Sequence, residues 1–168
     1  HQRVAFVAGI RSPLGEQYEA GFRGAIEAAG GALAQEHVVF IGSDGYADYA
    51  AYEKLADEAI GKLVAGPNRP TAIFTGFDNT AELIFLQLVR HGLTVPRDIS
   101  LISFGGASRI TPMQQRLTAV TVDEVEIGRR AAELLDEMRS GRRAIQSDER
   151  FEISLGLSEG QTVADIRS

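Results

Sequence analysis

The stretch HGLTVPRDISLISF, residues 91–104, contains the end of a helix, a turn and a buried strand. Gly92 is the type of residue that ends a helix, and Pro96 disfavours helical backbone at Val95 and so fixes the turn. The apolar run ISLISF, residues 99–104, is typical of a strand that is buried on both faces. A helix that returns directly into a buried strand indicates a parallel sheet.

The same alternation of strand and helix extends back to the start of the chain. Short apolar runs predict further strands at residues 4–8, 37–42 and 71–76. Apolar side chains at helical spacing predict helices over residues 17–29, 49–64 and 79–91. Four strands that alternate with three helices predict an α/β fold, in which a parallel sheet with right-handed crossovers carries helices on both faces.

The pattern changes after the fourth strand. An irregular loop leads to a short strand in residues 117–122 and then to an amphipathic helix over 123–140, which Asp123 can cap. Residues 150–157 alternate as a half-exposed strand would. The last eleven residues, SEGQTVADIRS, show no pattern of core residues and are expected to form a tail.

Composition excludes several classes of function. A net charge of -6 and a pI near 5.1 argue against a surface that binds nucleic acid, which needs clustered Lys and Arg. The chain has no cysteine, and its three histidines are scattered, so we expect no metal and no cofactor. No apolar run reaches the roughly 20 residues of a membrane span, and no signal peptide is visible, so we expect a soluble, cytoplasmic protein without membrane contact.

A ligand site is expected where the strands end. In an open parallel sheet the ligand crevice lies beyond the carboxyl ends of the strands. The loops at that edge all contain glycine, and most of them also carry aromatic or charged side chains. The candidate ligand-binding residues are Arg11, Tyr18, Asp44, Tyr46, Phe77, Asp78 and Phe104. Aromatic rings beside carboxylates and an arginine suit a polyhydroxylated ligand, because the apolar face of a sugar stacks while its hydroxyls form hydrogen bonds.

Several of these residues also have purely structural interpretations. Asp78 precedes a helix and can be its amino-cap, and Asn79 with Glu82 fits a capping box. Tyr18 lies at helical spacing from the apolar residues of its helix and can be core, and Asp44 can be a turn residue. No nucleophile, base and orienting group can be assembled, and no phosphate-loop or nucleophile-elbow motif occurs, so binding without catalysis is favoured.

Residues 69–104 closely resemble the LacI/GalR family of bacterial transcriptional regulators. In that family, a strand and an Asp-led helix run into the pattern G-L-x-V-P-x-D-I-S-[LV]-I-x-[FY], which this chain carries as GLTVPRDISLISF. HQRVAFVAG with AGFRGAIEAAG is similar to the first strand and helix of the lobe, and RLTAVTVDEVEIGRRAAELL is similar to a later strand and helix. The resemblance covers essentially the whole chain.

The resemblance implies the carboxyl-terminal portion of a two-lobed effector-binding domain, related in fold to periplasmic sugar-binding proteins. Residues 1–116 would be the second lobe, 117–147 a strand and helix that return to a first lobe absent from this chain, and 148–168 a final strand and tail. The effector-contacting arginine of the family falls on Tyr18, and its effector-binding aspartate falls on Gly105. Two strong polar contacts to a sugar are therefore replaced.

The resemblance also implies a function and partners. We expect the ligand-sensing and dimerisation portion of a regulator that binds a small effector between its lobes, forms a homodimer and reaches DNA only through an upstream domain. The most apolar helix, 79–91, is the candidate dimer contact through Leu83, Ile84, Leu86 and Leu88, with core packing as the alternative. The competing hypotheses are a transport-type sugar-binding protein of the same fold and a small α/β enzyme.

Overall fold

A six-stranded sheet, ordered β2-β1-β3-β4-β5-β6, organises the chain. The computed structural model describes residues 1–42, 48–105, 116–144 and 150–165. The strands are β1 (Val4–Ile10), β2 (Val38–Gly42), β3 (Ala72–Thr75), β4 (Ser100–Gly105), β5 (Thr118–Val122) and β6 (Leu155–Ser158). Strands β1 to β5 pair in parallel, and β6 pairs antiparallel with β5. The predicted parallel sheet is therefore confirmed.

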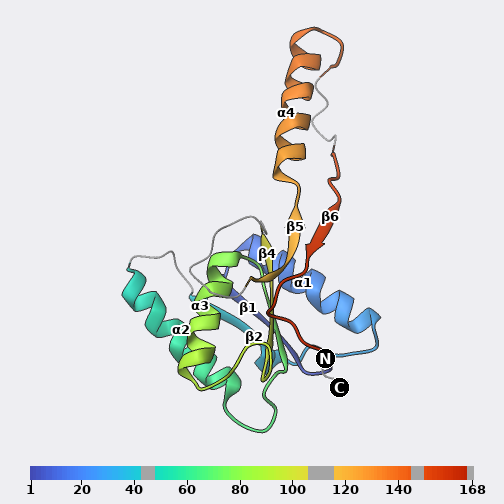
Figure 1. Ribbon diagram of the computed structural model, residues 1–168. Coiled ribbons are helices and arrows are strands. Elements are labelled where there is room, and N and C mark those ends of the chain that lie inside the picture. Colours follow the sequence, from blue (N-terminus) through green and yellow to red (C-terminus); the bar gives the residue numbers. More distant parts are fainter. Residues whose placement is uncertain (43–47, 106–115, 145–149, 166–168) are drawn as a thin grey trace.

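Helices cover both faces of this sheet, as the sequence predicted (Figure 1). Helix α1 (Pro13–Ala28) lies on one face, over a cluster that contains Phe6 and Leu33. Helices α2 (Tyr49–Val64) and α3 (Asp78–Arg90) lie on the other face, over the larger core. A 3-10 turn, η1 (Gln35–His37), leads into β2. The two cores hold the strands so that β1, β3 and β4 end along one edge.

Two helix starts differ from the predicted ones. Helix α1 begins at Pro13, earlier than predicted, because Ser12 caps it by accepting a hydrogen bond from the backbone of Gly15 and proline suits the first helical position. Helix α3 begins at Asp78, with Phe77 at the capping position and no side-chain cap. Its end agrees with the prediction, since Gly92 follows it with a left-handed φ of 76°.

The segment after β6 packs against the sheet, so the prediction of a tail without core contacts was wrong. The hydroxyl of Thr162 donates to the backbone oxygen of Leu101 at 2.6 Å and accepts from the backbone nitrogen of Thr118 at 2.9 Å. The backbone oxygen of Thr162 also accepts from Leu101, at 2.7 Å. Thr162 is fully buried and joins β4 to β5 at the point where their own pairing begins.

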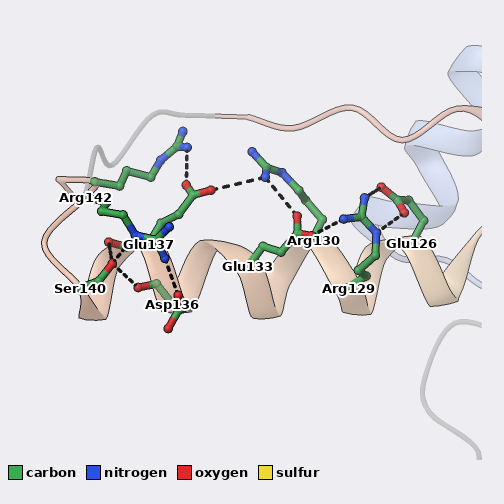
Figure 2. A network of polar contacts seen from close by, with 9 residues as sticks. Glu126, Arg129, Arg130, Glu133, Asp136, Glu137, Ser140 and Arg142 are labelled. Carbon is green, nitrogen blue, oxygen red and sulfur yellow. Dashed lines mark hydrogen bonds and ion pairs between the residues drawn. The ribbon is translucent and has the colours of Figure 1, made fainter.

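Helix α4 (Glu124–Arg139) extends away from the body of the sheet, following directly from β5 (Figure 1). Asp123 caps it by accepting from the backbone of Glu126 at 2.8 Å, as predicted. None of its residues is buried. Figure 2 shows ion pairs along one side of the helix, where Arg129 lies between Glu126 and Glu133. Exposed pairs of this kind stabilise a helix only modestly.

The assignment of residues 117–147 to a first lobe stays a prediction. Strand β5 belongs to the same sheet as β1 to β4, whereas α4 exposes apolar side chains such as Val125 and Leu135. Within the described part of the chain, no helix is both long enough and apolar enough to cross a membrane.

Candidate functional site

A pocket of about 410 Å³ lies where β1, β3 and β4 end and where α1 and α3 begin. This is the edge at which the sequence predicted a ligand. Its floor is formed by the backbone of Gly9, Gly76 and Gly105, which lie at the ends of the three strands. Most of the side chains around it are aromatic or polar, and these belong to Ser12, Tyr18, Phe77, Asp78, Asn79, Thr80 and Phe104; Ala8 and Ile10 also line it.

Three aromatic rings form one wall of the pocket. The ring of Tyr18, from α1, lies 5.2 Å from that of Phe104 and 6.0 Å from that of Phe77, measured between centroids. Gly76 permits this approach, because a Cβ there would lie only 2.9 Å from the Tyr18 ring. Phe77 keeps 46% of its surface exposed beside the pocket. The wall thus offers an apolar surface to the flat face of a ligand.

A buried carboxylate lies beside the aromatic wall. Asp78 is 7% exposed, and the hydroxyl of Ser103 donates to its Oδ1 at 2.6 Å. Its other oxygen, Oδ2, lies over Gly105, where a Cβ would overlap that oxygen and come within 2.7 Å of the Asp78 Cγ. Gly105 is therefore needed for this position of the carboxylate.

The structure brings together five of the residues predicted from the sequence: Tyr18, Phe77, Asp78, Phe104 and Gly105. Ser12 and Asn79 also line the pocket and were not among the predicted site residues. Ser12 precedes a proline, a signal for a helix start at this edge. Asn79 had been assigned to a capping box.

The structure places Arg11 outside the lining of this pocket, and its role as a ligand contact stays a prediction. Its Nη1 donates to Glu16 Oε1 at 3.1 Å, and its guanidinium lies 4.1 Å from the centroid of the Phe40 ring. This cation–π contact and the ion pair hold the side chain against β2. Asp44 and Tyr46 lie outside the described residues.

The capping interpretations of Asp78 and Asn79 were wrong. Asp78 is the first residue of α3 and not its cap, and Asn79 Oδ1 accepts from the adjacent backbone nitrogen of Thr80 at 2.8 Å. The core interpretation of Tyr18 holds in part, since its half-buried ring packs against the α1 cluster while it lines the pocket.

The predicted dimer contacts separate into two groups. Leu83, Ile84 and Leu88 are buried in the core beneath α3, so they are not available to a second chain. Leu86 is 42% exposed and lies on the outer side of the helix, as does Val89. A helix that is apolar nearly all round buries most of its surface against its own sheet.

Among the residues that the structure describes, no three acidic or histidine side chains gather closely enough to hold a metal ion. The arrangement in the pocket suits noncovalent binding. It offers an apolar wall for stacking, the oxygen atoms of Asp78 as acceptors and the polar side chains of Ser12 and Asn79.

The sequence profile of the periplasmic binding protein-like domain family matches residues 1–163. This chain belongs to that family. Its resemblance to LacI/GalR regulators is also confirmed. The chain is 29% identical over 137 residues to catabolite control protein A of Priestia megaterium, a match that covers 80% of this chain and 39% of the relative. It is 30% identical over 170 residues to the repressor PurR of Erwinia tasmaniensis, covering 98% and 46% respectively.

The periplasmic binding protein-like fold is also found among solved structures. A LacI-family transcriptional regulator from Lactobacillus casei, solved with bound glucose, superposes with a TM-score of 0.71 at 21% identity over 97% of this chain and 57% of that one. The domain spans less than half the length of these two curated relatives. One of these relatives is named a transcriptional repressor and the other a control protein.

Proposed function

We propose that this periplasmic binding protein-like domain is the ligand-sensing part of a bacterial transcriptional regulator, and that the pocket at the carboxyl edge of its sheet binds the effector. The observation that carries the proposal is the placement of three aromatic rings and a buried carboxylate where β1, β3 and β4 end. In open α/β sheets, this edge is where ligands bind.

A sugar or a related small molecule fits the chemistry of this pocket. The wall formed by Tyr18, Phe77 and Phe104 can stack on the apolar face of a ring, and Asp78 can accept hydrogen bonds from hydroxyl groups. The glucose-bound Lactobacillus casei regulator supports this class of ligand. Enzymatic turnover and a transport role have less support, because the two curated relatives are regulators.

The effector would act by shifting a conformational equilibrium. A ligand changes the population of two states only to the extent that it binds them with different affinity. The acidic charge of this chain, -6, disfavours direct contact with DNA, so the response would reach DNA through another part of the full-length protein.

Binding can be tested by thermal shift and calorimetry on the full-length protein with a panel of sugars, nucleobases and nucleosides. A ligand at 100 times its Kd stabilises the native state by about 2.7 kcal/mol, so a true effector raises Tm clearly. Phe77→Ala should weaken binding about ten-fold through loss of stacking.

Phe151→Ala is the matched control, because Phe151 is 42% exposed and lies outside the pocket. A flat thermal response across the whole panel, or equal losses in the two variants, would contradict the assignment of this pocket.

We also propose a homodimer in which the outer side of α3 contacts a second copy, since Leu86 and Val89 are exposed there. Leu86→Glu should shift the protein toward monomer in sedimentation velocity. Leu14→Glu is the control, because Leu14 is similarly exposed, at 46%, on α1 at the opposite face of the sheet. A dimer that survives Leu86→Glu would place the contact elsewhere.

A further inference from the structure

The described side chains that line the pocket carry negative charge and no positive charge. Among its described lining side chains there is a single carboxylate, that of Asp78, and there is no lysine, arginine or histidine. Arg11, the one cation among the predicted ligand contacts, instead contacts Glu16 and Phe40. A ligand that enters the pocket therefore meets a negative charge without a basic side chain among the described residues to offset it.

Asp78 is placed to contact that ligand. Among the described residues, the Ser103 hydroxyl is the hydrogen-bond partner of its carboxylate, and it contacts Oδ1. The second oxygen, Oδ2, lies over Gly105, and both residues line the pocket. Because this carboxylate is largely removed from water, a ligand must supply donors to it rather than a second negative charge.

The positive ends of two helices at the pocket oppose the negative charge of Asp78, but their attraction for an anion is largely offset. Helices α1 and α3 both begin there, and the positive end of a helix is equivalent to roughly half a charge and attracts anions. Ser12 and Asn79 already accept hydrogen bonds from backbone nitrogens in the first turns of α1 and α3. Because these acceptors already take up part of the positive end of each helix, what remains of the two half charges is smaller than the full charge of Asp78.

We infer that this pocket selects neutral or cationic ligands that carry hydrogen-bond donors, and that it rejects phosphorylated and other anionic ones. Asp78 determines this selectivity, and Gly105 is a positioning residue that leaves room for its carboxylate. The inference rests on the proposed function and specifies the class of effector.

The expected discrimination follows from the charges. A single negative charge held about 5 Å from the carboxylate, at an effective dielectric constant of about 20, is disfavoured on the order of 100-fold, and the greater charge of a phosphate ester is disfavoured more. With partial compensation by the two helix ends, at least a ten-fold preference for the neutral member of a matched pair should remain.

The test measures affinities of the full-length protein for three matched pairs by calorimetry: D-glucose and D-glucose 6-phosphate, D-ribose and D-ribose 5-phosphate, and adenosine and adenosine 5'-monophosphate. We expect a neutral member to bind and its phosphate ester to bind at least ten-fold more weakly. A phosphate ester that binds as tightly as its neutral partner, or more tightly, would overturn the inference and leave the proposed function standing. No binding by either member of any pair would instead count against the proposed function.

The variant Asp78→Asn keeps the shape of the side chain and removes its charge. It should reduce the preference within a pair to less than about three-fold, and inorganic phosphate should now raise its Tm, because the helix ends are no longer offset. Asp48→Asn is the matched control, since Asp48 caps α2 outside this pocket, and it should preserve the wild-type preference. An unchanged preference in Asp78→Asn would refute the role of its charge.

Gly105→Ala provides a second test that keeps the charge. Its Cβ would overlap Asp78 Oδ2 and displace the carboxylate, so the neutral ligand should bind at least ten-fold more weakly. Circular dichroism and the melting curve of each variant establish that it is folded before affinities are compared. Wild-type affinity in a folded Gly105→Ala variant would show that the placement of this carboxylate does not matter to the ligand.

Discussion

Replacing Thr162 by valine should destabilise the protein strongly, although the two side chains have nearly the same shape. Thr162 is 0% exposed, and its hydroxyl bonds both the Leu101 oxygen and the Thr118 nitrogen. Valine would leave both backbone groups buried without that partner. Each such group costs about 1–3 kcal/mol, so the free energy of unfolding should fall by about 2–6 kcal/mol.

The variant Thr162→Ser separates the contribution of the hydroxyl to stability from that of the methyl group. Serine retains both hydrogen bonds and loses one buried methyl, which costs about 1 kcal/mol. Urea unfolding followed by circular dichroism gives the free energy of unfolding for the wild type and both variants, and the slope with urea should stay constant. If valine costs no more than serine, the hydroxyl does not tie the final segment to the sheet, and the reasoning fails.

Three further results are expected. Phe6→Ala should cost about 3–5 kcal/mol in urea unfolding, because this fully buried ring contacts three other rings; a cost below about 1 kcal/mol would contradict its central place in the core. The hydrogen bond from Arg97 lowers the pKa of Asp98 from 3.8 to about 2, so its contribution to stability is present above about pH 4 and lost as the pH falls toward 2. Between about pH 4 and pH 2, the urea midpoint of Asp98→Asn should fall less than that of the wild type. An equal fall in both proteins would show that Asp98 makes no such contribution to stability. Arg11→Ala should leave effector affinity within about two-fold in calorimetry, and a larger loss would return Arg11 to the site.

The sheet and its helices could be predicted because hydrophobic periodicity follows burial directly. Residues 49–64 were predicted as a helix, and α2 has the same bounds. The stretch around Gly92 was sufficient to indicate a parallel unit, and its strand β4 does pair in parallel with β3 and β5. The early start of α1 was missed because Ser12 and Pro13 stand in a glycine-containing stretch that was interpreted as a loop, although both residues favour a helix start.

The final segment and part of the pocket could not be predicted by the same reasoning. Thr162 is buried for its hydrogen bonds rather than for its apolar surface, so hydropathy gives no sign of it. Topology located the edge at which the pocket lies, but side-chain direction decides which residues line it. Arg11 turns to the Phe40 ring, whereas Tyr18, several residues along α1, turns inward.

Strand β5 lies between the pocket floor and α4. Gly105 on the pocket floor is paired with Thr121, and α4 begins at Glu124, three residues further along. The helix has 16 residues and is about 24 Å long, so a tilt of about 5° at its base displaces its far end by about 2 Å. Any change in the direction of β5 would therefore displace the far end of α4 more than its base.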